Sequence, residues 1–389
     1  MSNRPLRIGL DVSCIAESPM TGIGYAALNQ LRALLRRVEA FEFHLFATGD
    51  RSGKANLEDL LPFTASHAIF RRARLVKYHL WTRLSWPPIE WSCGPLDIAH
   101  NFSHHTPATK EALRVVTVHD LSFLRHPETH TARTIEVQTR LVRQVAREAD
   151  AVVAVSQSCK SEMVELLGIP EDRIHVVPNG IHPEEFAGPL DSETLDVLKQ
   201  RLGISREYFI QLGTVEPRKN IPRLVEAYAR LREKRREVPQ LVFVGKPGWK
   251  CEASFHPMKP LAETKDIVYA GYVDRSEAVL LLRGALACVY PSIYEGFGLP
   301  VLEAMAARTP VITSNTSSMP EVAGDTALLV NPTDVDSITC ALEQTFDDRI
   351  AADSRAEAAF TRAQTFTWER SAETLAGLYR TLADKRGAR

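Results

Sequence analysis

Residues 290–306, YPSIYEGFGLPVLEAMA, join a strand-like apolar run to a helix-like apolar run through a glycine turn. Pro300 stands where the helix would begin, because proline is well tolerated in a first helical turn. A glycine-rich turn that leads into a helix N-terminus is typical of an anion-binding site. Glu295 and Glu303 flank the turn, so the stretch predicts a strand–turn–helix unit with an anion seat between two carboxylates.

The same alternation continues on both sides of this unit, in two series. The strand-like runs are residues 6–12, 41–47, 97–102, 114–118, 151–155 and 174–177, then 208–212, 241–244, 267–270, 287–290, 311–313 and 327–330. Helix-like runs lie between them at residues 25–37, 131–149 and 158–167, then 221–236, 275–283, 300–307 and 334–346. Alternating strands and helices predict parallel sheets covered on both faces, hence an α/β protein of two Rossmann-like, doubly wound domains.

The domain boundary is expected near residues 182–189, HPEEFAGP, which are rich in proline and acid and lack periodicity. We therefore predict domains at residues 1–183 and 184–366, followed by a terminal segment at 367–389. That segment contains an amphipathic helix with an apolar stripe that has to dock on another element: Trp368, Leu375, Leu378 and Leu382. Ligands bind at the carboxyl ends of strands in such sheets, so two facing domains predict a cleft between them.

Composition excludes several classes of protein. The 389 residues are 44 % hydrophobic and 24 % charged with a formal net charge of −1, which favours an ordinary globular protein without a polyelectrolyte partner. The N-terminal residues lack the apolar core of a secretion signal, and no apolar run reaches the ~18 residues that span a bilayer. The six cysteines have no metal-site spacing, which favours reduced thiols and a cytoplasmic location.

The glycines of MTGIGYAA, Gly22 and Gly24, match the dinucleotide fingerprint G-x-G-x-x-G/A together with Ala27. The match is poor because the first glycine follows its strand only after about nine residues and no acid is suitably placed after the second strand. A glycine loop that lets backbone amides approach a phosphate or a sugar is the preferred interpretation, with a plain tight turn as the alternative.

Two further motifs follow predicted strands. In LGTVEPRKN, Arg218 and Lys219 stand side by side, which suits a diphosphate; the alternative is a solvated basic pair, although cations are disfavoured at a helix start by ~0.3–1 kcal/mol. In VTVHDLSF, His119 and Asp120 end a strand, so His119 is a candidate proton handler or hydrogen-bond donor, or else a structural histidine. Asp334 and Asp336 form a D-x-D pattern, which we interpret as helix capping rather than as a metal site.

A basic and aromatic stretch without acids lies between Asp59 and Glu90. It favours an anionic membrane surface or an acceptor-binding face, with a solvated basic face as the alternative; no nucleic-acid-binding fold accompanies it. The residues proposed for this face are Arg71, Arg72, Arg74, Lys77 and Trp81.

With these motifs together, the sequence resembles the retaining GT-B glycosyltransferases of family 4. Glu295 and Glu303 match the E-x7-E motif of that family, and TGIGY, VTVHDLS, VVPNGI and GTVEPRKN match as well. The resemblance covers almost the whole chain and is most specific over residues 208–332. The sequence around Arg218, GTVEPRKNIPRLVEAY, looks most like that of bacterial mannosyl- and rhamnosyltransferases of lipopolysaccharide or exopolysaccharide assembly.

The resemblance implies an N-terminal acceptor domain, a C-terminal domain for a nucleotide-sugar donor, and a final helix that returns to the N-terminal domain. Arg218 and Lys219 would neutralise the diphosphate, Glu303 would bind the ribose, and Glu295 would bind hydroxyls of the donor sugar. The remaining donor-binding residues would be Gly22, Gly24, Gly213, Thr214, Gly271, Tyr272, Val273, Gly296, Phe297, Gly298 and Leu299, with His119 near the anomeric carbon.

Two departures from the family pattern stand out. Thr214 occupies a position where many members carry an arginine, and Arg308 occupies one where glycine is usual, so a phosphate contact and a local turn are in question. The implied reaction moves a hexose to a hydroxyl of a glycan or lipid-linked acceptor, without a metal or other cofactor because protein cations meet the phosphates. A glycoside hydrolase, a GT-B epimerase or phosphorylase, and a non-catalytic nucleotide-sugar sensor are the competing classes.

Overall fold

The protein is described by a computed structural model that covers residues 4–17, 20–36, 41–49, 53–71, 80–81, 83–235 and 237–387. The chain divides into two compact units. The first holds Met1–Leu124, Ala132–Gly180 and Trp368–Arg389, and the second holds Arg125–Thr131 and Ile181–Thr367. The predicted N-terminal domain included residues 125–131. Their contacts instead group them with the second unit, although the segments on both sides of them belong to the first.

The first unit is built on a seven-stranded parallel sheet with strand order β3-β2-β1-β4-β5-β6-β7. The strands are β1 (Leu6–Asp11), β2 (Phe41–Gly49), β3 (Ser66–Arg71), β4 (Ile98–Asn101), β5 (Leu113–Val118), β6 (Ala151–Ala154) and β7 (Ile174–Val176). The helices are α1 (Gly22–Leu35), α3 (Glu90–Cys93), α4 (Ser122–Arg125), α5 (Ala132–Glu148), α6 (Gln157–Leu167) and α16 (Trp368–Gly387). Strands β4 and β6 are buried along their whole length, as expected for a sheet covered on both faces.

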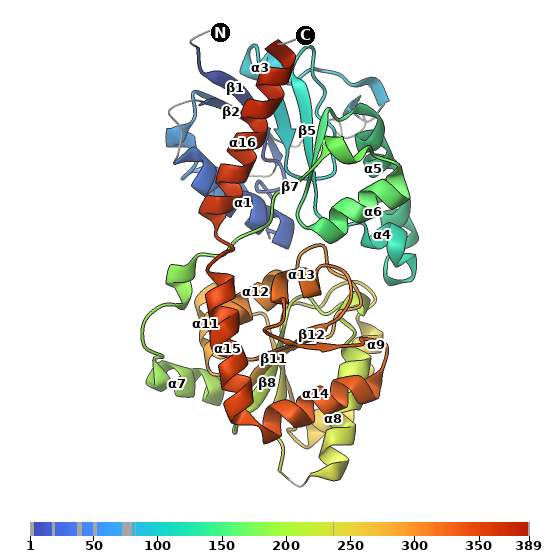
Figure 1. The fold of residues 1–389 in the computed structure, drawn as a ribbon, viewed down its shortest axis with the longest axis vertical. Coiled ribbons are helices and arrows are strands. Elements are labelled where there is room, and N and C mark those ends of the chain that lie inside the picture. The colour runs from blue at the N-terminus through green and yellow to red at the C-terminus, as the bar shows by residue number, and fades with distance from the viewer. Residues whose placement is uncertain are drawn as a thin grey trace. The chain divides into compact units, whose positions relative to one another are not determined.

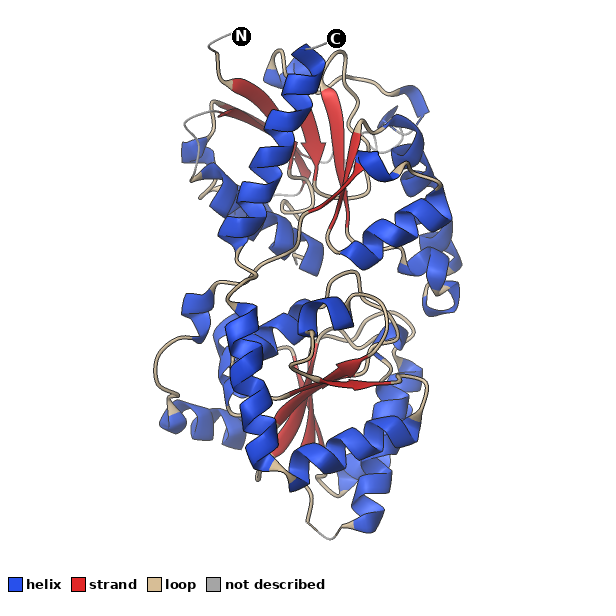
Figure 2. Cartoon of the chain, viewed as in Figure 1, coloured by secondary structure: helices blue, strands red, loops and turns tan. Residues whose placement is uncertain are grey.

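The second unit repeats this plan with a six-stranded parallel sheet of order β10-β9-β8-β11-β12-β13. Its strands are β8 (Tyr208–Leu212), β9 (Gln240–Val244), β10 (Ile267–Gly271), β11 (Ala287–Tyr290), β12 (Val311–Ser314) and β13 (Leu328–Val330). Its helices are α7 (Ser192–Leu202), α8 (Ile221–Lys234), α9 (Glu252–Phe255), α10 (Lys259–Glu263), α11 (Arg275–Arg283), α12 (Leu299–Ala306), α13 (Met319–Ala323), α14 (Val335–Asp347) and α15 (Arg349–Ala363). Helices flank the strands in each unit (Figure 2), so the prediction of two doubly wound α/β domains is confirmed.

The terminal helix α16 packs along α1 in the first unit (Figure 1). Its apolar stripe is buried, with Trp368 and Leu375 fully inaccessible to solvent. Two polar contacts fix the helix: Gln30 Nε2 donates to Ser371 Oγ at 2.8 Å, and Tyr379 Oη lies 2.6 Å from Nδ1 of a buried histidine, His100. The last helix therefore completes the core of the unit that the N-terminus begins.

Several elements were not predicted. β3 is an edge strand of sequence SHAIFR, and its polar start masks the alternation that identifies a half-buried strand. α15 buries only alanines, namely Ala352, Ala356, Ala359 and Ala363, so its core-facing stripe is weak in the sequence.

Candidate functional site

The candidate site centres on Glu295, which lies in the turn between β11 and α12. Lys219 Nζ donates to its Oε1 at 2.6 Å, and Arg218 Nη1 donates to its Oε2 at 2.8 Å. Both cations come from a 3-10 turn, Pro217–Lys219, that follows the carboxyl end of β8. The predicted basic pair is therefore directed at the carboxylate that the sequence places 76 residues away from Lys219.

Burial makes this ion cluster electrostatically strong. Lys219 is 7 % exposed and Glu295 is 8 % exposed. Burial by itself would raise the pKa of Glu295, but Arg218 and Lys219 outweigh it and hold that pKa below its ordinary value. A second buried acid, Glu216, accepts from Arg218 Nη2 at 2.7 Å, yet there burial prevails and raises its pKa. Glu295 is thus the favoured site of the negative charge.

Tyr290, the last residue of β11, closes the cluster. Its hydroxyl donates to Glu295 Oε1 at 3.0 Å and accepts a hydrogen bond from Lys219 Nζ. Burial, and then the negative charge of Glu295, raise the pKa of Tyr290 well above its usual value, so the hydroxyl stays protonated as a donor. We did not single out Tyr290 or Glu216 from the sequence, although both lie inside the motifs quoted above.

A run of hydroxyl side chains that starts at the last residue of β12 positions the backbone around Glu295. Ser317 Oγ accepts from the Glu295 amide at 3.0 Å, and Ser318 Oγ donates to the Glu295 carbonyl at 2.9 Å. Thr316 and Ser314 donate in the same way to the carbonyls of residues 293 and 292. These bonds hold the segment rigidly before its glycine turn, and no pattern in the sequence signals them.

The glycine turn itself leads into α12 as expected. Gly298 is the N-cap at φ 97°, a left-handed conformation that favours glycine, and Pro300 lies in the first helical turn. The amides predicted for anion binding, around Phe297, Gly298 and Leu299, therefore stand at a helix N-terminus. Nearby, Gly213 and Gly245 pack so closely that a Cβ at Gly245 would lie 1.9 Å from the Gly213 carbonyl oxygen.

The predicted donor-binding residues Gly271, Tyr272 and Val273 lie at the end of β10 and directly after it. Tyr272 is 67 % exposed, and the Lys246 ammonium lies 4.2 Å from its ring centroid, whereas Val273 is buried and Gly271 has φ +67°. Thr214 is exposed at the end of β8. Glu303, on α12, accepts from Arg275 Nη1 at 2.5 Å, a partner that we did not predict.

His119 lies in the first unit, directly after β5. Its Nε2 is 2.9 Å from the Phe102 carbonyl oxygen, which only accepts, so Nε2 carries the proton and Nδ1 keeps the lone pair. The His119 amide donates to His104 Nε2 at 3.2 Å. Burial lowers the pKa of His119 to about 4, so the imidazole is neutral at neutral pH.

Gly22 and Gly24 differ from the prediction. They form the first turn of α1, which begins three residues before the expected helix start, with Thr21 Oγ1 accepting from the Gly24 amide at 3.3 Å. Gly24 is required by packing, because a Cβ there would lie 2.6 Å from the Cys14 carbonyl oxygen. The motif is therefore a capped helix start rather than a free loop.

The basic and aromatic face needs one correction. Trp81 is 3 % exposed, stacks on Phe46 and donates from Nε1 to the Pro87 carbonyl at 3.0 Å, so it belongs to the core. Arg72, Arg74 and Lys77, and the side chain of Arg71, lie outside the described residues.

Helix capping by Asp334 is confirmed, since its carboxylate accepts from the Asp336 amide at 2.9 Å. Within the described part of the chain, no group of three or more histidine, cysteine, aspartate or glutamate side chains is placed to hold a metal ion. In the same residues, every helix is too short or too polar to cross a membrane.

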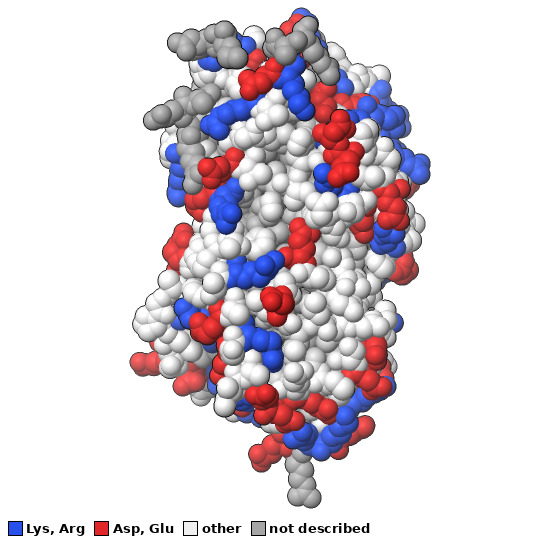
Figure 3. Space-filling view, viewed as in Figure 1, with Lys and Arg blue, Asp and Glu red and all other residues white. Residues whose placement is uncertain are grey.

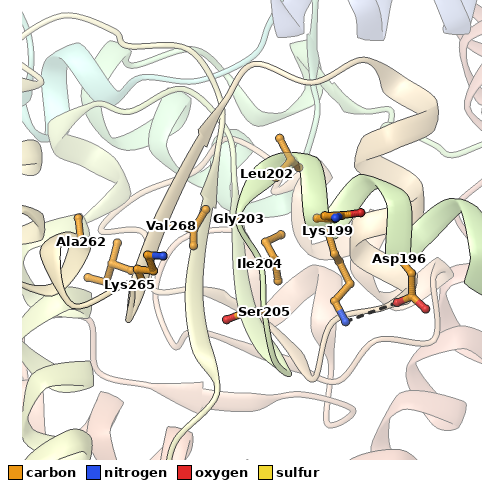
Figure 4. Close-up of a pocket in the computed structure, with 11 residues that line it drawn as sticks. Asp196, Lys199, Leu202, Gly203, Ile204, Ser205, Ala262, Lys265 and Val268 are labelled. Atoms are coloured by element: carbon orange, nitrogen blue, oxygen red, sulfur yellow. Dashed lines mark ion pairs between the residues drawn. The ribbon is translucent and has the colours of Figure 1, made fainter.

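Figure 4 shows a surface pocket of about 640 Å³ in the second unit, between the C-terminal half of α7 and the first half of β10. Lys199 lies 3.8 Å from Asp196 on its wall, and Lys265 stands across from this pair. None of the predicted donor-binding residues lines the pocket. It is therefore separate from the Glu295 cluster, which lies beyond the carboxyl ends of the strands.

The loop after β9 binds the segment Arg125–Thr131 through hydrogen bonds and a ring contact. Trp249 Nε1 donates to the Thr129 carbonyl at 2.7 Å and its ring stacks on His130. Lys250 Nζ donates to the carbonyls of Glu128 and His130 at 2.9 and 2.7 Å. These contacts explain why the segment groups with the second unit.

Comparison with known proteins agrees with this architecture. The family model for glycosyl transferases group 1 matches residues 196–362, and that for glycosyltransferase family 4 matches residues 20–185. The chain is 30 % identical over 374 residues to O-antigen chain mannosyltransferase B of Escherichia coli, covering 94 % of this chain and 97 % of that protein. It is 31 % identical to MMP alpha-(1->4)-mannosyltransferase of Mycolicibacterium hassiacum, over 63 % of this chain and 56 % of that one.

Solved structures extend the likeness to the fold. HepE of Anabaena, in complex with UDP and glucose, superposes with a TM-score of 0.74 at 16 % identity, over 97 % of this chain and all of that one. Sucrose-phosphate synthase of Thermosynechococcus elongatus gives 0.74 at 19 % identity, over 97 % and 99 %. These neighbours support the predicted GT-B fold. By the match to both family models and the identity to a relative along nearly its full length, the chain belongs to the family 4 glycosyltransferases.

Proposed function

We propose that this glycosyltransferase moves mannose from GDP-mannose to a hydroxyl of a lipid-linked or oligosaccharide acceptor in cell-surface polysaccharide biosynthesis. In the proposed reaction the bond between the anomeric carbon and the diphosphate oxygen breaks, and a bond to the acceptor oxygen forms on the same face. The acceptor proton passes to the leaving phosphate oxygen, so the product retains its anomeric configuration without a separate carboxylate base.

The observation that carries this proposal is the buried cluster of Arg218, Lys219 and Glu295 beside a helix N-terminus. Charge gathers on the phosphates as the sugar becomes oxocarbenium-like, and preorganised cations and amides stabilise that charge without reorganisation. Glu295 holds both cations in place before the donor binds. The choice of mannose rests on the names of the two mannosyltransferase relatives.

The test is a donor screen that follows release of nucleoside diphosphate from GDP-mannose, UDP-glucose, GDP-rhamnose and dTDP-rhamnose. Release from GDP-mannose only when a glycan or lipid-linked acceptor is added is the expected result, with an α-linked product by NMR. Release from UDP-glucose instead would overturn the choice of sugar but leave the enzyme class intact. A protein that binds donors and transfers none of them would be a non-catalytic binding subunit.

We infer that no metal ion is needed, because Arg218, Lys219 and the amides of residues 296–299 would neutralise the phosphates of a bound donor. The initial rate is expected to be unchanged after treatment with EDTA. A rate that EDTA abolishes and Mg²⁺ restores would contradict this.

We also propose that the segment between Asp59 and Glu90 binds an anionic, inner-leaflet membrane surface, which would make the enzyme cytoplasmic and peripheral. Exposed apolar side chains support this: Leu84 and Trp86 within the segment are 66 % and 48 % exposed, and Trp91 directly after it is 67 % exposed. Figure 3 shows basic and acidic side chains interspersed on one face, so a local patch rather than the whole surface would have to bind. Replacing Arg71, Arg72 and Arg74 by Gln should reduce sedimentation with phosphatidylglycerol vesicles; unchanged sedimentation would contradict the proposal.

A further inference from the structure

The second acid of the E-x7-E motif is held by an arginine outside every predicted motif. Glu303 lies on α12 with its side chain 12 % exposed. Its Oε1 accepts from Arg275 Nη1 at 2.5 Å, whereas its Oε2 makes no hydrogen bond to any residue that the structure describes. Burial raises the pKa of Glu303, and Arg275 opposes that effect. Oε1 of this carboxylate is therefore occupied by Arg275, and Oε2 is available to accept a hydrogen bond from a ligand.

Arg275 is itself anchored from the opposite side. Its Nε and Nη2 both donate to Glu185 Oε2, at 2.9 and 2.8 Å, and the Phe186 ring lies 5.6 Å from its guanidinium carbon. Glu185 and Phe186 belong to the turn Pro183–Phe186, which begins two residues after the second unit does at Ile181. A planar guanidinium with carboxylates on two edges has little freedom to turn, so its direction is fixed before any ligand binds.

This arrangement does more than neutralise charge. A lysine would balance the charge of Glu303 equally well, but as a point charge it would not fix which oxygen faces the ligand. A ribose hydroxyl needs an acceptor of defined direction, and a charged acceptor makes that hydrogen bond stronger than a neutral acceptor would. The anchoring of Arg275 supplies that direction.

We propose that Arg275 is a positioning residue for the donor nucleotide: anchored on Glu185, it holds Glu303 by Oε1 and leaves Oε2 to accept a hydrogen bond from a ribose hydroxyl. This proposal rests on the proposed function, because it places a nucleoside diphosphate at this site. It adds Arg275 and Glu185 to the residues that decide nucleotide affinity.

Calorimetry with matched nucleotides tests it. GDP, UDP and ADP are titrated first, and the one that binds is compared with its 2′,3′-dideoxy form. Arg275→Gln is expected to weaken binding of the ribonucleotide about tenfold and to leave binding of the dideoxynucleotide unchanged. Arg275→Lys should recover only part of the loss. The matched control is Arg201→Gln, which removes an arginine that pairs with Glu277 on the neighbouring helix and should change neither affinity.

Two further variants sharpen the result. Glu185→Gln should cause a smaller loss with the same preference for the ribonucleotide, and Arg275→Gln combined with Glu303→Gln should be no weaker than Glu303→Gln alone. An equal loss for ribo- and dideoxynucleotide in Arg275→Gln would overturn the positioning role, as would unchanged affinities. A wild-type protein that binds none of the three nucleotides would instead overturn the proposed function, and Arg275's role with it.

Discussion

At the scale of single residues, the ion cluster around Glu295 makes Lys219 the most sensitive position. Lys219→Met keeps most of the side-chain length and removes one of the two cations that the proposed reaction assigns to the leaving group. Loss of one preorganised charge at such a site costs about 10²–10³ in turnover, so kcat should fall by that factor with little change in acceptor KM. Steady-state kinetics with the cognate donor checks this. Lys199→Met, the same change on the wall of the pocket in Figure 4, is the matched control and should be inert.

The same variant also leaves Glu295 with one fewer counter-ion, and breaking a buried pair destabilises a protein by about 3–5 kcal/mol. Adding Glu295→Gln to Lys219→Met should therefore recover stability but not turnover. A double variant that recovers turnover would show that Lys219 acts only through the fold.

Arg308 is a second informative residue, because it occupies a left-handed conformation at φ 57° just after α12. Its guanidinium carbon lies 3.8 Å from the Phe360 ring centroid and it pairs with Glu357, so these contacts on α15 offset a backbone strain of about 1–2 kcal/mol. The doubt raised by the missing glycine is thus answered by side-chain packing.

The order of stabilities follows from this balance. Arg308→Gly loses the contacts and also the strain, so its free energy of unfolding should stay within about 1 kcal/mol of wild type. Arg308→Ala loses the contacts and keeps the strain, so it should be the less stable of the two. Urea denaturation of both variants decides the matter, and an alanine variant more stable than the glycine variant would contradict the account.

At the scale of elements, Trp249 and Lys250 bind residues 125–131 to the second unit, although the chain on both sides of these residues belongs to the first unit. Trp249→Phe keeps most of the ring stacking on His130 and removes the hydrogen bond to the Thr129 carbonyl. A hydrogen bond of this kind contributes about 1 kcal/mol, so amide exchange in this segment should accelerate about fivefold.

Hydrogen exchange followed by mass spectrometry measures the effect peptide by peptide. Trp91→Phe, at a tryptophan that is 67 % exposed in the first unit, is the control and should leave exchange in residues 125–131 unchanged. Exchange in Trp249→Phe that matches wild type would mean that Lys250 alone holds the segment.

At the scale of the whole molecule, the buried histidines of the first unit make stability depend on pH. His100 is fully buried between Tyr379 and Thr117, and burial lowers its pKa to about 3 from its ordinary value of 6.5. The unfolded chain then binds a proton that the native state rejects, so stability is complete above about pH 6.5 and falls as pH drops toward 3. Below about pH 3, the loss of unfolding free energy that is due to His100 approaches about 5 kcal/mol.

Urea midpoints measured at pH 8, 6 and 5 test this. Wild type should lose stability across the series, and His100→Asn should be less stable at pH 8 but lose less on acidification. His67→Asn, at an exposed position in β3, should follow wild type. A wild-type midpoint that rises on acidification would contradict the assignment.

Prediction from sequence reached the fold and much of the candidate site, for reasons visible in particular residues. Strands such as β8 (YFIQL) and β9 (QLVFV) are mostly apolar because both faces are buried. The turn Gly296–Leu299 could be predicted because Gly298 and Pro300 are typical of a helix start. The contacts of Arg275, Tyr290 and Ser317 were missed, because ordinary residue types carry no local signature of a partner far away in the chain.

The sequence alone determined the series of βα units, because these follow from local hydrophobic periodicity. It also determined the family and the chemical groups available at each strand end, because these follow from short sequence motifs. Only the tertiary structure decided how those groups pair. Glu295 faces Arg218 and Lys219, Glu303 faces Arg275, Trp81 is in the core, and residues 125–131 belong to the second unit. The physical reason is that burial and charge pairing depend on distances through space. The packing of the whole chain sets these distances, and the residues adjacent in sequence do not.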